Sequence, residues 1–237
     1  MIDVKLYRQC LPSIFVSLQE KHKREYSDWH SIYSADGEDI LHLKGADLNQ
    51  VDLETLLCLL LMHREKNIPV GDNLKFSIYE YYQNFLYPAK KNTLHLCNIH
   101  YERLKGSLKS LATSTLYFAS DKSSFIDSFI RQISISEGSI EIQMSTDLAP
   151  LVEEMGIDFE KFVTMTQWQR WLYLLITGTD QKKITISEDE MFILSRHNGQ
   201  RRNIRYRWQG NLPGLVEMKV IDPEWSLENE VFNCKKL

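Results

Sequence analysis

Six side chains that could contact nucleic acid lie within twelve residues near the C-terminal end of the chain. They are Arg196, Arg201, Arg202, Asn203, Arg205 and Arg207. A guanidinium group can bind a phosphate or pair with the O6 and N7 atoms of guanine, and an asparagine amide can pair with the edge of adenine. Because residues 195–216 contain no Asp or Glu, the segment has a net charge of +5. These residue types could therefore contact the phosphates and base edges of double-stranded DNA.

A second cationic segment covers residues 88–124, with six Lys or Arg, two acidic residues and a net charge of +4. Its candidate DNA contacts are Lys90, Lys91, Asn92, Thr93, His95, Asn98, Lys109 and Lys122. The whole chain of 237 residues has a net charge of −4, so the other residues carry −13. Two cationic segments on an acidic body indicate two surfaces for a polyanion, although two solvated helices would give the same counts.

The elements that position the first segment can be predicted from hydrophobic spacing. An amphipathic helix is predicted from Leu53, Leu56, Leu57, Leu60 and Leu61, with Asp47 and Gln50 as its capping box. A strand at 74–78, a short helix at 79–85 and a longer helix at 92–111 follow. Strands at 114–119, 129–136 and 139–144 are predicted to form a hairpin or a three-stranded meander, with Gly138 at a turn.

The second half of the chain repeats this order. The same helical spacing recurs in Trp168, Trp171, Leu172, Leu175 and Ile176, with Thr164 and Gln167 as the predicted capping box. We place the two tryptophans in the core because they lie on the apolar face. A strand at 183–187, a short helix at 188–194, a helix from about residue 200 and strands at 215–221 and 230–234 complete the second unit. Equivalent elements are about 110 residues apart, which indicates two copies of one unit.

The order helix, strand, helix, helix, hairpin is typical of a winged helix, whose third helix enters a DNA major groove. Each cationic segment coincides with a predicted third helix, so charge and spacing agree. We therefore predict an α+β fold with two tandem winged-helix domains, at residues 38–150 and 151–237. Residues 1–37 form a lead segment, in which Ile14, Phe15, Val16 and Leu18 make an apolar cluster. This cluster either packs on the first domain or pairs with a second chain.

The sequence resembles the TrfA-type plasmid replication initiators over about residues 13–237. The most specific stretch runs from Gly45 through Gln50, Asp52 and Leu53 into the leucine-rich helix, and then through residues 71–80. The lead segment at 14–33, with its basic residues 21–24, is similar more loosely. The second unit matches in its order and in residues 214–217, taken as a turn into a terminal hairpin that ends near residue 235.

The resemblance implies binding to the repeated sequences of a plasmid origin, called iterons, and recruitment of host proteins such as the replicative helicase and the initiator ATPase. It also implies a homodimer that dissociates into an active monomer, with the lead segment and the first unit as the pairing surface. No individual base contact can be transferred, because the third helices do not align residue by residue.

Other chemistry has little support in the sequence, and we expect neither a cofactor nor enzymatic activity. No phosphate-binding loop of the GxxxxGK[ST] type occurs, and nucleases are disfavoured because Asp, Glu and Lys do not cluster in a catalytic pattern. His95, Cys97 and His100 do not indicate a metal site, because residues two apart on a helix point in nearly opposite directions. The four cysteines are scattered, as in a reduced protein.

The longest apolar run, residues 56–62, is too short to span a bilayer, and we expect a cytoplasmic protein. Two other functions stay open. One is a tandem winged-helix transcriptional regulator, and the other is a protein-interaction module that does not bind DNA.

Overall fold

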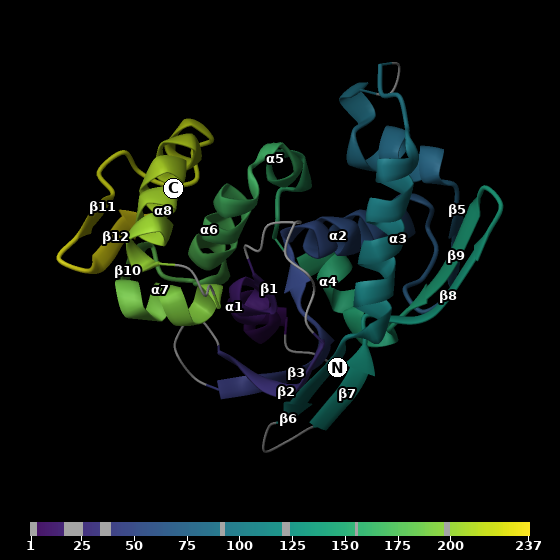
Figure 1. Ribbon diagram of the computed structural model, residues 1–237, viewed down its shortest axis with the longest axis horizontal. Helices are drawn as coiled ribbons and strands as arrows, with labels where there is room; N and C mark the ends of the chain where they lie inside the picture. Colours follow the sequence, from purple (N-terminus) through teal and green to yellow (C-terminus); the bar gives the residue numbers. More distant parts are fainter. Residues whose placement is uncertain are drawn as a thin grey trace.

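The computed structural model describes residues 4–16, 26–33, 39–90, 93–119, 124–154, 156–196 and 200–237. Figure 1 shows two mixed units of helix and sheet, with helix α3 in the right half and helix α8 in the left half. Helices α1, α2 and α6 lie between α3 and α8 in this view. Both units are winged helices, so the predicted fold class is confirmed. The predicted domain boundaries at 38 and 151 stay a prediction.

The first unit has the predicted helix, strand, helix, helix, hairpin order. Its elements are α2 (Gln50–Glu65), β5 (Asn73–Phe76), the π-helix η1 (Glu80–Leu86), the short 3₁₀ helix η2 (Pro88–Lys90), α3 (Asn98–Thr113), β8 (Ile130–Ser136) and β9 (Ser139–Met144). Strands β8 and β9 form the wing hairpin, and β5 pairs with β9 to give the order β5-β9-β8. Gly138 has φ 74° at the hairpin turn, a conformation that favours glycine.

A second sheet of this half was not predicted. It has the order β2-β3-β6-β7 and consists of β2 (Tyr26–Tyr33), β3 (Asp39–Ala46), β6 (Thr115–Ala119) and β7 (Ser124–Ser128). The three-stranded meander of 114–119, 129–136 and 139–144 is therefore wrong, although the hairpin around Gly138 is confirmed. The strand at 115–119 pairs with β3, about 70 residues earlier, because Leu116 lies opposite Leu43 on the buried face. Local alternation contains no information about such a distant partner.

The second unit follows the short helices η3 (Thr146–Leu148), α4 (Ala149–Glu154) and α5 (Phe159–Thr164). It consists of α6 (Gln167–Gly178), β10 (Lys183–Ser187), α7 (Glu188–Ser195), α8 (Arg201–Glu217), β11 (Ser226–Glu228) and β12 (Val231–Lys235), with sheet order β10-β12-β11. The strand predicted at 215–221 is wrong, since α8 continues to Glu217 through Pro213. Leu212 and Leu215, both fully buried, continue the helical spacing begun by Ile204 and Trp208.

Helix starts differ from the predictions by a few residues. The capping box of α2 is Asn49 with Asp52, not Asp47 with Gln50, and that of α6 is Thr166 with Gln169, not Thr164 with Gln167. In both helices the observed capping pair lies two residues after the predicted pair. The predicted and the observed pair have the same i, i+3 spacing, so the spacing alone does not distinguish them. The α3 helix begins at Asn98 rather than at 92, because Cys97 is extended and caps the helix together with His100.

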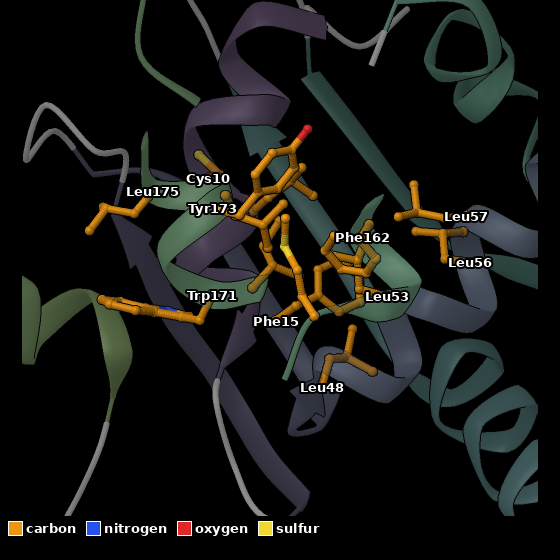
Figure 2. Close-up of a cluster of buried hydrophobic side chains, with 14 of the residues drawn as sticks. Cys10, Phe15, Leu48, Leu53, Leu56, Leu57, Phe162, Trp171, Tyr173 and Leu175 are labelled. Carbon is orange, nitrogen blue, oxygen red and sulfur yellow. The ribbon is translucent and has the colours of Figure 1, made fainter. Parts of the chain in front are cut away.

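Residues 4–16 of the lead segment lie between the two units, whereas its strand β2 joins the four-stranded sheet. Helix α1 (Val4–Ile14) packs on α6 and continues into β1 (Phe15–Val16), which pairs with β4 (Leu48–Asn49). Trp171 donates from Nε1 to the carbonyl oxygen of Pro12 at 2.9 Å. Figure 2 shows side chains from α1, α2, α5 and α6 in one buried cluster, including Cys10, Leu53, Phe162 and Trp171. The core is therefore continuous between the units.

The apolar cluster of the lead segment was predicted either to pack on the first domain or to pair with a second chain, and the structure decides between these roles for Ile14, Phe15 and Val16. Ile14, Phe15 and Val16 are each at most 1% exposed inside the chain. They pack within their own chain, against both units, and offer no surface for pairing. Leu18 and the basic residues 21–24 lie outside the described residues. Among the described residues, no helix is long and apolar enough to cross a membrane.

Candidate nucleic-acid interface

Helix α8 presents one polar face to solvent. Arg202, Asn203 and Tyr206 are exposed, and Tyr206 retains 76% of its accessible surface. One turn further on, Gly210 has open space where a side chain would be, so another molecule can approach the backbone closely. Tyr206 was missed in the sequence, although its position two residues from both Ile204 and Trp208 places it on the face of the helix opposite the core.

The opposite face of α8 is fixed by aromatic packing. Trp208 is fully buried, with its ring stacked on Trp171 at 5.9 Å and tilted against Phe192 at 4.9 Å. Trp168 is also buried, which confirms that the two tryptophans of α6 belong to the core. Because one face of α8 is held by large rigid rings, the backbone that carries the exposed side chains of the other face has a defined position.

Two arginines of the cationic segment contact acidic residues of the preceding helix. Arg201 pairs with Asp189 and lies over the ring of Phe192 at 4.9 Å. Arg205 donates to the carbonyl oxygen of Leu227 at 3.1 Å and lies 3.5 Å from the carboxylate of Glu188. The acids that oppose the cluster therefore come from α7, outside the window in which the sequence count found none.

The remaining arginines of this segment differ in their surroundings. Arg196 ends α7 with φ 48° and forms an ion pair with Asp47 at 2.8 Å, which connects the second unit to the first. Arg207 is exposed, and its guanidinium lies 5.6 Å from the centre of the Trp168 ring. Within the described part of the chain, Arg202 and Arg207 form no ion pair, so both charges are available to a ligand.

The exposed face of α3 carries Asn98, Glu102, Lys105 and Lys109, which are spaced by three or four residues. Asn98 and Lys109 were candidates from sequence, whereas Lys105 entered only the charge count. Its i, i+4 relation to Lys109 could have identified it. Arg103 points elsewhere, with Nη2 3.4 Å from Glu54 of α2.

The candidates before α3 occupy a turn rather than the first turns of the helix. Lys90 is exposed, with its ammonium 5.6 Å from the centre of the Tyr87 ring, and Thr93 donates from its hydroxyl to the carbonyl oxygen of Lys90 at 3.3 Å. His95 is also exposed, three residues before α3. Lys91, Asn92 and Lys122 lie outside the described residues.

The start of α3 is held by contacts with η1. Tyr82 donates to the carbonyl oxygen of His100 at 2.9 Å, and burial raises the pKa of its phenol, so this donor keeps its proton. Cys97 precedes the helix, with Sγ 3.1 Å from Nδ1 of His100. His95 and Cys97 lie ahead of the helix, so the helical argument made from the sequence does not apply to them. The described residues contain no group of three His, Cys, Asp or Glu suited to a metal ion.

The tips of both wings are neutral or acidic. Glu137 and Gly138 are exposed at the end of the β8–β9 hairpin. Glu228, Asn229 and Glu230 are exposed at the end of the β11–β12 hairpin. Carboxylates repel phosphates, so the cationic contacts available to DNA are on the helices and not on the wing tips.

Comparisons with known proteins support the fold. No protein-family model matches the sequence, and no curated protein matches it. Among solved structures, a crystal structure of domains 2 and 3 of RctB has a TM-score of 0.64 at 11% identity and covers 100% of this chain and 99% of that chain. A second structure of RctB domains 2–3 has a TM-score of 0.62 at 9% identity, with coverage of 98% and 97%.

A weaker likeness is to the Pi initiator protein in complex with iteron DNA, with a TM-score of 0.48, 15% identity, and coverage of 84% of this chain and 97% of that chain. This score is too low to support an argument. The particular resemblance to TrfA stays a prediction. What the comparisons establish is that the two winged-helix units have the fold of domains 2 and 3 of RctB.

Proposed function

We propose that this protein is a plasmid replication initiator that binds repeated origin sequences as double-stranded DNA, with α8 and α3 in successive major grooves. The observation that carries the proposal is the exposed face of α8, where Arg202, Asn203 and Tyr206 stand on a helix whose other face is locked by Trp208. The fold shared with RctB domains 2 and 3 and the sequence resemblance to TrfA-type initiators support it.

Each exposed group of α8 has a defined task in this proposal. Arg202 forms two hydrogen bonds with a guanine or binds a phosphate, and Asn203 pairs with an adenine. Tyr206 contributes an aromatic surface for a thymine methyl group and a hydroxyl that can donate to a phosphate. Arg207 binds the DNA backbone beside the groove, and the open backbone at Gly210 permits close approach.

The first unit supplies the second contact. Lys105 and Lys109 neutralise phosphates along α3, and Asn98 lies in the first helical turn, where recognition helices usually contact bases. Two contacts about one helical turn of DNA apart would let one protein molecule cover roughly two turns, about 20 base pairs.

The proposal includes no enzymatic activity and no cofactor. Opening of the origin would use binding energy or the ATP hydrolysis of a host initiator, and the replicative helicase would be recruited by contact. The protein would act in the bacterial cytoplasm, with a homodimer as its inactive form.

The test is selection of bound fragments from the replicon that encodes this chain. Enrichment of direct repeats is expected, with a footprint of roughly two helical turns. Enrichment of one palindrome would identify a transcriptional regulator, and no enrichment would identify a protein-interaction module. The variant Arg202→Ala/Tyr206→Ala should lose the enrichment, whereas Tyr79→Ala, which changes an exposed tyrosine outside α3 and α8, should keep it.

A further inference from the structure

A buried carboxylate joins the two units. Glu54, in the middle of α2, is 2% exposed. Its Oε2 atom lies 2.5 Å from Nη1 of Arg170 in α6, and its Oε1 atom lies 3.4 Å from Nη2 of Arg103 in α3. One carboxylate therefore contacts an arginine from each unit, and one of these arginines belongs to the proposed recognition helix α3.

The contact with Arg170 is rigid. This side chain is 5% exposed, and its Nε and Nη2 atoms donate to the carbonyl oxygens of Phe162 and Val163, both at 2.9 Å. Its guanidinium also lies over the Phe162 ring at 5.0 Å. The planar guanidinium thus ties α6 to the end of α5 with two nitrogens and to α2 with the third, which a lysine could not do.

The contact with Arg103 fixes the orientation of α3. Arg103 lies beside the exposed positions Glu102 and Lys105, so its direction determines where they point. One turn further along α3, the hydroxyl of Ser107 donates to the buried carboxylate of Asp52 at 2.7 Å. Two polar contacts one helical turn apart hold α3 against rotation about its own axis.

Polar contacts of this kind constrain geometry more than apolar packing does. Apolar surfaces can slide with little loss of contact, whereas a buried carboxylate loses most of its stabilisation once its partners move away. A buried ion pair is weak evidence for stability, and its best-attested use is to select one arrangement among several. The position of Glu54 between α3 and α6 fits that use.

We infer that Glu54 is a positioning residue that holds α3 against α6, and through the Trp171–Trp208 stack against α8, and thereby sets the spacing between the two DNA segments that the protein binds. The inference rests on the proposed function for its DNA part only. The orientation itself can be measured without DNA.

The first experiment measures this orientation. Spin labels are attached at Lys105→Cys and Tyr206→Cys in a Cys97→Ser background, because the other three cysteines are buried. Glu54→Gln keeps the shape of the side chain and removes its charge. The control is Glu65→Gln, which makes the same change on the same helix at an exposed pair with Arg64. The distance distribution should at least double in width for Glu54→Gln and stay narrow for the control, and an unchanged width would overturn the inference.

The second experiment measures the spacing of the DNA segments. A duplex selected by the wild-type protein from a randomised pool is lengthened by 1 to 4 base pairs between its two protected segments. Each base pair rotates the segments by about 35° relative to one another. Two added base pairs should weaken binding of the wild type and of Glu65→Gln by about 30-fold, and of Glu54→Gln by less than about 5-fold, each relative to its own best duplex.

These results separate the inference from the proposed function. Normalising to each variant's best duplex removes any general loss of folded protein, so an identical spacing profile for Glu54→Gln would overturn the inference. A wild-type protein that selects no duplex would refute the proposed function, while the distance measurement would still decide the role of Glu54. If Glu54→Gln does not fold, Arg103→Gln removes the contact of Glu54 with α3, keeps the Glu54–Arg170 pair and serves in both experiments.

Discussion

The salt dependence of DNA binding should distinguish arginines that the fold already uses from those it leaves available. Each phosphate contact contributes about 0.9 to the slope of log affinity against log salt concentration. Between 50 and 200 mM salt, a fourfold change, one contact therefore corresponds to about a 3.5-fold difference in affinity. Arg202 is exposed and forms no ion pair within the described part of the chain, so Arg202→Ala should lower the slope by about 0.9.

Arg205→Ala should behave differently. Its guanidinium already donates to the carbonyl oxygen of Leu227 and faces Glu188, so its loss should lower stability and leave the slope unchanged. Asp189→Asn should change the salt slope in the opposite direction, because it breaks the ion pair of Arg201 and removes a nearby negative charge. That variant should steepen the slope by up to about 0.9.

Fluorescence anisotropy with a labelled duplex at four salt concentrations gives all three slopes, and urea unfolding gives the stabilities. A loss of slope for Arg205→Ala as large as that for Arg202→Ala would refute the reasoning. That result would mean that the ion pairs between the arginines of α8 and the acidic residues of α7 break when DNA binds.

Three further changes test the fold itself. Deletion of residues 1–16 should give aggregated or unfolded protein rather than a folded monomer, because it exposes Trp171 and removes its acceptor at Pro12; size-exclusion chromatography would show this, and a monodisperse, cooperatively unfolding product would contradict it. Gly45→Ala should cost about 1–3 kcal/mol in urea unfolding, since Gly45 has φ 116° and a Cβ would overlap the carbonyl oxygen of Thr113. Burial lowers the pKa of His63 in the folded chain. Below about pH 6.5 the imidazole is therefore protonated in the unfolded chain but still neutral in the folded chain, and the free energy of unfolding decreases as the pH falls from there to the pKa of the folded state. His63→Gln should remove this fall in urea midpoint between pH 7 and 5.5, and a curve parallel to the wild type would contradict the assignment.

Sequence reasoning succeeded where one local rule dominates. The helical spacing of Trp168, Trp171 and Leu175 marks the buried face of α6, and the alternation of residues 183–187 marks β10. Both patterns arise from contacts within a few residues and the simple requirement of burial on one side. The repeated order of such elements was sufficient to predict two winged helices.

Sequence reasoning failed where a strand pairs with a strand far away in the chain, and where one pattern of apolar residues suits both a helix and a strand. The strand predicted at 114–119 is confirmed as β6, but its pairing with β3 joins residues about 70 positions apart, which alternation cannot specify. The end of α8 was mispredicted because Leu215 and Val220 suit a strand as well as a helix. Only the packing of Leu212 and Leu215 in the core shows that the chain stays helical to residue 217.

The difference between neighbours in sequence and neighbours in space also explains why a charge count along the chain misses the acids that face the arginines. A count along residues 195–216 finds five arginines and no acid, yet Arg196, Arg201 and Arg205 face carboxylates at Asp47, Asp189 and Glu188. A short turn joins the second and third helices of a winged helix, and in this chain acids at the start of α7 lie beside cations in the first turns of α8. They also suit that position for a local reason, because negative charge stabilises a helix N-terminus. An acidic start to α7 therefore lets an overall acidic chain hold a cluster of arginines, and it leaves Arg202 and Arg207 as charges that a duplex can use without breaking an ion pair of the described residues.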